Sequence, residues 1–178
     1  MAAPAAVPRT IGRAKRRSRG LTFIEAVVVM GIVAAFAAVA MPAYNDLSAR
    51  QKLAGASQQV ADDLQEARSE AVQRNRRVYV SFRSGAQWCY AISLQPACDC
   101  AQPAAACALR RGDGQAFDGV GLPAARDTAF DPRLGLASTP AGVTLALGER
   151  TAEVQLAASG RARACARGAD LPGLPRCS

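Results

Sequence analysis

Residues 19–43 read RGLTFIEAVVVMGIVAAFAAVAMPA, and this stretch decides the fold. Between Leu21 and Ala43 the only charged residue is Glu25. At about 1.5 Å per residue, a helix from Ala26 to Ala43 would be roughly 27 Å long, which is close to the thickness of the hydrocarbon core of a bilayer. The sequence therefore predicts a membrane-spanning helix near the N-terminus.

The positive charge of the chain is concentrated just before this helix. The chain has 178 residues and a formal net charge of +8, from 22 Lys+Arg and 14 Asp+Glu. Residues 1–20 contain six basic residues and no acidic residue, so the rest of the chain has a net charge of only +2. A basic segment ahead of an apolar helix predicts that the N-terminus stays in the cytoplasm and that the C-terminal part crosses the membrane. The charge thus argues for orientation in a membrane before it argues for a general nucleic-acid-binding protein.

The composition argues against an enzyme. The chain has no histidine, which excludes the Ser-His-Asp and Cys-His nucleophile systems and imidazole metal sites. It has neither a P-loop nor a dinucleotide-binding glycine motif. The adjacent carboxylates Asp62 and Asp63 fall on a helix face that we expect to be solvated. We therefore expect no catalytic residue, no cofactor and no metal ion.

Three interpretations of the N-terminal segment compete. A secretory signal peptide would have a basic start, an apolar stretch and a small-residue cleavage site, which Ala38-Val39-Ala40 could supply. An uncleaved signal anchor is the second. In the third, the heptapeptide from Arg19 to Glu25 resembles the prepilin peptidase recognition motif of type IV pilins and type II secretion pseudopilins. Glu25 favours this third interpretation, because an ionisable residue inside an apolar segment costs roughly 2.5–3.5 kcal/mol and usually has a functional partner.

This resemblance implies a maturation pathway and a set of partners. A prepilin peptidase would cleave after Gly20 on the cytoplasmic side and N-methylate Leu21, although the family usually has phenylalanine at that position. Glu25 would pair with the N-terminal amine of a neighbouring subunit during assembly. Pro42 matches a family proline and would kink the helix, because proline removes a helical hydrogen bond. The implied partners are the inner membrane before assembly and then other major and minor pilins or pseudopilins.

The helix is expected to continue well beyond the membrane. From Tyr44 to about Arg77 there is no proline, and apolar residues recur at helical spacing. These residues are Leu53, Val60, Leu64, Ala67 and Ala71. We expect one helix from Leu21 to about Asn75, with residues 21–43 as the transmembrane and assembly half and residues 44–77 as the amphipathic half.

After Arg77 the hydrophobic period changes to two. Alternation predicts strands at 78–82 and 88–94, joined by a tight turn at Ser84-Gly85. Residues 96–107 are expected to form a loop, and any strands within 112–140 to be short. Further strands are expected at 143–147, 153–156 and 161–165. The predicted fold class is α+β and pilin-like, with a long N-terminal helix packed on a mostly antiparallel, disulfide-bonded β domain at residues 78–178.

Two further segments resemble one branch of the pilin superfamily. The sequence EARSEAVQR at 66–74, followed by VYV at 78–80, resembles the minor pilin family that groups FimT with the type II secretion subunit GspH. This N-terminal match covers about residues 16–80. Near the C-terminus, Gly160-Arg161-Ala162-Arg163 resembles the Gly-Arg-x-Arg motif of FimT-type pilins linked to DNA uptake.

All six cysteines lie beyond the membrane segment, at Cys89, Cys98, Cys100, Cys107, Cys165 and Cys177. An even number of cysteines on the exported side indicates disulfides in an oxidising periplasm. Spacing does not fix the connectivity, but we favour Cys165 with Cys177, and Cys89 with Cys98, Cys100 or Cys107. A metal site is disfavoured, because Cys98-x-Cys100 lacks the usual ligand spacing and no histidine is present.

The last twenty residues concentrate basic charge. They contain Arg161, Arg163, Arg167 and Arg176 against Asp170 alone. Arg161 and Arg163 would point to the same face of a strand, where two guanidinium groups suit phosphate oxygens. Gly160 would let the backbone approach a ligand closely. Alternatively, these arginines only protect a solvated sheet edge against pairing. A second basic group at Arg74, Arg76, Arg77 and Arg83 could extend the surface.

Two functions therefore remain open. The first is a FimT-like minor pilin of a type IV pilus, which helps to build the fibre and has double-stranded DNA as a candidate partner in natural transformation. The second is a GspH-type minor pseudopilin of a type II secretion system, with a structural role only. Both place a single-pass protein in the bacterial inner membrane, with a periplasmic C-terminal domain, before assembly.

Overall fold

The computed structural model describes residues 22–102, 107–168 and 170–178. The expected leader at residues 1–20, the cleavage site at Gly20 and the methylation site at Leu21 lie outside the described residues. The chain forms two compact units that divide between Pro42 and Ala43, and each is described by itself.

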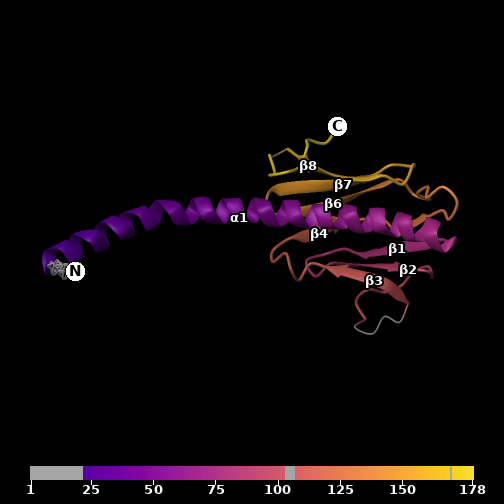
Figure 1. The fold of residues 1–178 in the computed structure, drawn as a ribbon, viewed down its shortest axis with the longest axis horizontal. Coiled ribbons are helices and arrows are strands. Elements are labelled where there is room, and N and C mark those ends of the chain that lie inside the picture. Colours follow the sequence, from indigo (N-terminus) through magenta and orange to yellow (C-terminus); the bar gives the residue numbers. More distant parts are fainter. Residues whose placement is uncertain (1–21, 103–106, 169) are drawn as a thin grey trace, which may run out of the picture. The chain divides into compact units, whose positions relative to one another are not determined.

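Helix α1 extends from Phe23 to Arg74 and belongs to both units (Figure 1). It begins after Thr22, whose Oγ1 accepts the N–H of Glu25 at 3.4 Å. It ends at Asn75, which has a φ of 49°. There the N–H of Asn75 donates to Val72 and the N–H of Arg76 to Ala71, each at 3.2 Å, which is the Schellman pattern of a helix C-terminus. The prediction of one long helix is confirmed. The helix continues through Pro42, and the kink stays a prediction.

The predicted apolar face of the second half of α1 is buried. Each of the five expected core residues, Leu53, Val60, Leu64, Ala67 and Ala71, is at most 2% exposed. The expectation for Asp63 is wrong: this carboxylate is 3% exposed, whereas its neighbour Asp62 is exposed. Asp63 is buried because it has partners, since the Tyr90 hydroxyl donates to it and the Arg110 guanidinium lies 2.9 Å away. Burial, reinforced by Asp63, raises the pKa of Tyr90.

Within the described residues, eight strands follow the helix and form two antiparallel sheets of four strands each. Figure 1 shows these sheets beside the second half of α1. The first sheet has the order β3-β2-β1-β5 and comprises β1 (Val78–Arg83), β2 (Cys89–Ser93), β3 (Ala108–Asp113) and β5 (Thr128–Phe130). The second has the order β4-β6-β7-β8 and comprises β4 (Gly121–Ala124), β6 (Ala141–Leu147), β7 (Arg150–Leu156) and β8 (Ala162–Arg167). The predicted α+β class is confirmed.

The alternating segments are the ones that form the predicted strands. β1 pairs with β2, and β6 pairs with β7 across the two-residue turn Gly148-Glu149. Strand β3 is missing from the prediction. It is an edge strand with three consecutive exposed residues, Leu109 to Arg111, so its sequence carries no alternation of apolar and polar residues.

One core unites the second half of α1 with residues of both sheets. The single tryptophan, Trp88, is 1% exposed, and its indole Nε1 donates to the carbonyl of Val120 at 2.8 Å. Backbone hydrogen bonds between Gly85 and Leu122, at 2.9 and 3.0 Å, join the two sheets. The domain is therefore held by apolar packing, with polar groups paired where they are buried.

Three disulfides lie within the described residues, which confirms the expected pairing of the cysteines in disulfides. Cys165 is bonded to Cys177, the favoured pair, and Cys89 is bonded to Cys100. The third bond joins Cys98 to Cys107. The Cys165–Cys177 bond fastens the C-terminal segment to β8, where the N–H of Ala166 also donates to the carbonyl of Pro175 at 2.8 Å.

Candidate functional site

The first half of α1 exposes an apolar surface with no internal partner. An 18-residue window of this helix has a mean hydropathy of 2.5, and none of it is buried. Among the described side chains from Phe23 to Met41, ten large apolar ones are at least half exposed. Covering them is worth on the order of 10–20 kcal/mol, which is comparable with the whole stability of a typical domain. This segment therefore requires a lipid or helical environment.

Glu25 lies at the third position of α1, and the structure gives it a local role. Thr22, Glu25 and the two residues between them form the T-x-x-E pattern of a capping box, of which the bond from the Glu25 N–H to Thr22 is present. A carboxylate in the first turn also complements the positive end of the helix dipole. The sequence carried this signal, because a capping box directly precedes the apolar run. Capping leaves the Glu25 carboxylate exposed and available to a partner chain.

Arg161 and Arg163 lie together at the edge of the second sheet. β8 is one of the two edge strands of that sheet; Arg163 lies on it, Arg161 directly precedes it, and both arginines are exposed. They line one hollow of about 420 Å³ with Gln65, Gln155 and Ser159. The Gln65 side chain donates to the carbonyl of Ala162 at 3.1 Å and so fastens this edge to α1. Neither arginine forms an ion pair within the described residues.

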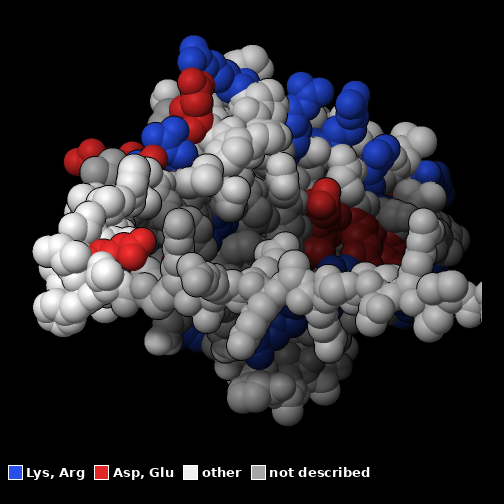
Figure 2. All heavy atoms as spheres, turned by 60° about the vertical axis from the view of Figure 1, so that its left-hand side comes forward, with Lys and Arg blue, Asp and Glu red and all other residues white. Residues whose placement is uncertain are grey.

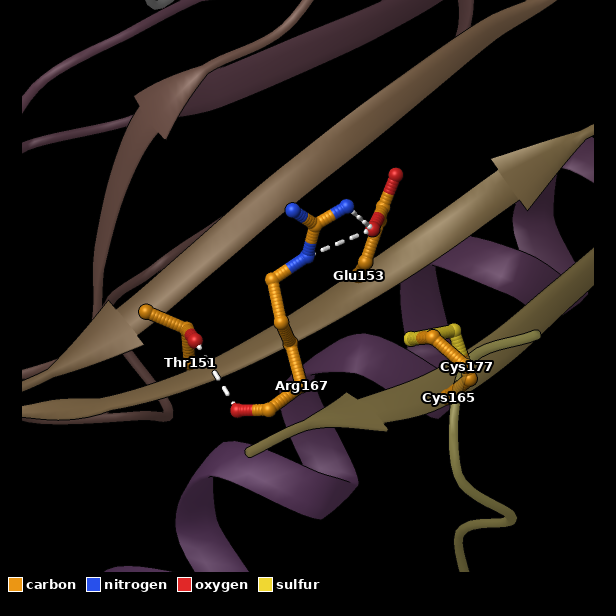
Figure 3. Close-up of polar contacts among 5 residues, drawn as sticks. All are labelled: Thr151, Glu153, Cys165, Arg167 and Cys177. Carbon is orange, nitrogen blue, oxygen red and sulfur yellow. Dashed lines mark hydrogen bonds and ion pairs between the residues drawn. A yellow bond between two sulfur atoms is a disulfide. The ribbon is translucent and has the colours of Figure 1, made fainter. Parts of the chain in front are cut away.

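The other two arginines of the C-terminal segment are neutralised. The Arg167 guanidinium binds Glu153, with Nε 3.0 Å from the carboxylate (Figure 3). Arg176 binds Asp170 through Nη2 at 2.9 Å. Figure 2 shows Lys and Arg side chains gathered along the upper edge of the view, the side on which Figure 1 draws β8. Of the four expected cations, only Arg161 and Arg163 are thus without an acidic partner in the described chain.

The close approach at Gly160 is to the protein itself. Gly160 has a φ of +77°, and a Cβ built there would lie 2.0 Å from the carbonyl oxygen of Gly135. The same Cβ would lie 3.0 Å from Arg68, whose Nε donates to that carbonyl at 3.2 Å. The glycine is therefore required for packing between two turns, independently of any ligand.

The second group of basic residues, Arg74, Arg76, Arg77 and Arg83, does not stay together in the structure. Arg74 forms an ion pair with Glu70 on α1. Arg76 and Arg77 are exposed just before β1, whereas Arg83 lies at the opposite end of that strand. These four arginines therefore do not form one patch.

One group of side chains has the composition of a metal site. The ligand atoms of Glu153, Cys165 and Cys177 lie within 4.8 Å of one another (Figure 3). The two sulfur atoms are bonded to each other, so neither is a thiolate, and Arg167 occupies the Glu153 carboxylate. These residues do not fit a metal ion.

The chain is similar to known proteins both in sequence and in fold. Residues 56–160 match the protein family described as type II transport protein GspH. The fold is similar to two crystal structures of the type IV minor pilin FimU from Pseudomonas aeruginosa PAO1. One is 19% identical with a TM-score of 0.54, covering 67% of this chain and 96% of that one. The other is 18% identical with a TM-score of 0.51, covering 66% and 98%. No curated protein matches at a significant level.

Proposed function

The chain belongs to the GspH family, and we propose that it is a minor pilin subunit of a type IV pilus. Before assembly, the subunit would be anchored in the inner membrane. The observation that carries the proposal is the apolar first half of α1, which has no buried residue in its most apolar window and precedes a disulfide-bonded domain. Lipid covers such a helix before assembly, and neighbouring subunits cover it in a fibre. Glutamine would complete the capping box as well, so the charge of Glu25 favours a partner chain over a plain membrane anchor.

Residues 1–20 are proposed to be a prepilin leader. The six basic residues of this segment would hold the N-terminus in the cytoplasm. Cleavage after Gly20 would then remove most of the positive charge and leave Leu21 as the N-methylated first residue. Residues 21–43 would be the assembly segment, residues 44–77 the part of the helix that packs on the domain, and residues 78–178 the periplasmic domain.

Glu25 is proposed to pair with the N-terminal amine of an adjacent subunit. In a bundle of apolar helices, an unpaired carboxylate is costly, and an opposite charge from a neighbour offsets that cost. The alternative system is a type II secretion pseudopilus, which the family description supports and which would use the same segment in the same way.

Intact-mass measurement of the chain isolated from its own membranes tests the maturation. We expect a chain that begins at Leu21 and carries one methyl group and three disulfides. A chain that begins at Met41 would instead establish a secretory signal peptide, and an unprocessed chain a plain signal anchor. Recovery in sheared surface fibres, rather than only in the membrane fraction, separates a pilus from a pseudopilus.

DNA binding is a second candidate function, and Arg161 and Arg163 favour it. Two exposed guanidinium groups on one hollow, without acidic partners in the described chain, can bind phosphate oxygens bidentately. The test is the salt dependence of double-stranded DNA binding, in a nonionic detergent, by the processed chain that begins at Leu21 and lacks the six basic residues of positions 1–20. Binding that is lost in Arg161→Gln/Arg163→Gln supports this function, and no binding by the unaltered chain at low salt refutes it.

A further inference from the structure

Two turns lie side by side next to the start of β8. The first turn is residues 131–136 and the second is residues 157–160. The N–H of Ala137, just after the first turn, donates to the carbonyl of Ala158 in the second at 3.1 Å. The backbone of Gly160 packs directly on the carbonyl of Gly135. Arg161 follows the second turn immediately, so it lies next to the first turn as well.

The first turn is rigid and carries its own arginine. Asp131 Oδ1 accepts the N–H of Arg133 at 2.9 Å and that of Leu134 at 3.1 Å. The carbonyl of Asp131 also accepts the N–H of Gly135 at 2.9 Å. Arg133 is exposed and forms no ion pair within the described chain. The turn thus presents a free guanidinium group from a fixed backbone.

The first sheet brings another arginine to the same turn. Val78 pairs with Phe130 in the antiparallel register of β1 and β5. Arg77, which precedes Val78, therefore lies opposite Asp131, which follows Phe130. Arg77 is exposed and also has no ion-pair partner among the described residues. Three separate segments therefore place arginines around one point of contact between the two sheets.

We propose that Arg77, Arg133, Arg161 and Arg163 form one phosphate-binding surface, here called the arginine strip, which takes the backbone of double-stranded DNA. This inference rests on the proposed DNA binding and extends it beyond the C-terminal motif. Guanidinium groups on fixed turns suit phosphate oxygens, and such contacts position a duplex without reading its sequence. Arg68 lies next to both turns. Its Nε donates to the Gly135 carbonyl against which the second turn packs, so it helps to fix the two turns relative to each other.

Asp131 opposes the strip and makes it testable in the reverse direction. The Asp131 carboxyl is negatively charged at neutral pH, as aspartate ordinarily is, and therefore repels phosphate. The backbone N–H groups of Leu134 and Arg133 lower its pKa further. Asparagine keeps the accepting Oδ1 and removes the charge. Asp131→Asn should therefore strengthen DNA binding while it preserves the turn.

The salt dependence of affinity counts the phosphate contacts. Four contacts predict a slope of log K against log salt of about −3.6, which is a loss of roughly 150-fold between 50 and 200 mM salt. Two contacts, from Arg161 and Arg163 alone, predict a loss of only roughly 12-fold over the same range. The measurement is fluorescence anisotropy of a labelled duplex in a nonionic detergent. The chain is purified from its own membranes and verified to begin at Leu21, so that the six basic residues of positions 1–20 add no contacts.

Single substitutions then assign the contacts. Arg133→Gln and Arg77→Gln should each reduce the slope by about 0.9 and weaken binding to all sequences alike. The matched control is Arg126→Gln: Arg126 is exposed and forms no ion pair in the described chain, but it precedes Asp127, which binds the N–H of Phe82 near the far end of β1. We expect this control to bind like the unaltered chain.

The possible results separate the strip from DNA binding itself. If Arg133→Gln and Arg77→Gln bind with an unchanged slope while Arg161→Gln/Arg163→Gln loses binding, the strip is wrong and the proposed DNA binding stands. If Arg126→Gln lowers the slope as much as Arg133→Gln does, binding is diffuse and the strip is again wrong. If the unaltered chain does not bind at low salt, both are wrong.

Discussion

Replacing Asp63 with alanine should lower the free energy of unfolding by about 2–3 kcal/mol. Asp63 is 3% exposed and Tyr90 is 1% exposed, so the substitution leaves the tyrosine hydroxyl buried without an acceptor. Such an orphaned group costs about 1–3 kcal/mol. The lost ion pair with Arg110 adds less than about 1 kcal/mol, because that arginine is 47% exposed and also binds Glu66.

Trp88 is a built-in probe for this experiment. It is the single tryptophan of the chain, and its ring stacks on Tyr90 with centroids 6.2 Å apart. Urea unfolding of the full chain in a nonionic detergent, followed by tryptophan fluorescence with disulfides intact, should show the loss. Asp62→Ala is the matched control, because this neighbouring carboxylate is exposed and should change stability by no more than about 0.5 kcal/mol.

A double variant separates the orphaned hydroxyl from other causes. Asp63→Ala/Tyr90→Phe removes both partners, so it should be less destabilised than the sum of the two single changes. Strict additivity would refute a direct interaction between the two side chains. Equal stabilities of Asp63→Ala and Asp62→Ala would refute the conclusion that a buried polar contact joins α1 to β2.

Three further predictions concern the stability of the domain, measured by the same unfolding assay. Gly160→Ala should lower the free energy of unfolding by about 3 kcal/mol or more, because strain at positive φ adds to a clash with the backbone of Gly135. Gly168→Ala, at a φ of +88° in open space, should lower it by only about 1–2 kcal/mol. Equal losses would contradict the packing role of Gly160. Cys165→Ser/Cys177→Ser should cost about 3 kcal/mol by freeing a loop with a sequence separation of 12, and no loss would contradict this. Folding raises the pKa of Tyr90, so above about pH 10 the tyrosine loses its proton in the unfolded chain before it does in the folded one. The free energy of unfolding should therefore fall as the pH rises above about 10, and Tyr90→Phe should reduce that fall. Parallel pH profiles of the two proteins would contradict this.

The elements that could be predicted are those set by local pattern. The uninterrupted apolar run after Glu25 has the length of a membrane span, and the spacing from Leu53 to Ala71 places one helix face in the core. Alternation in the β1–β2 and β6–β7 segments predicts the hairpins. In each case the physical information lies within a few residues of the chain.

The features that could not be predicted depend on contacts between distant segments. Asp63 on α1 is buried against Tyr90 of β2 and Arg110 of β3, which lie far from it in the sequence. The charge of Arg167 is paired with Glu153 on the neighbouring strand. Strand β3 pairs along one edge only, so it needs no alternating pattern. A candidate site made of charged side chains is therefore only partly readable from sequence, since the ion pairs decide which charges remain.

We propose that this chain assembles through the apolar half of α1 and the charge of Glu25. The most direct test is the amount of Glu25→Gln chain in sheared fibres relative to the membrane fraction, compared with the unaltered chain. Glutamine keeps the Thr-x-x-Gln form of the capping box and removes only the charge. We predict a normally processed subunit that remains in the membrane and is nearly absent from fibres. Incorporation of Glu25→Gln into fibres at the unaltered level would show that the charge of Glu25 is not needed for assembly.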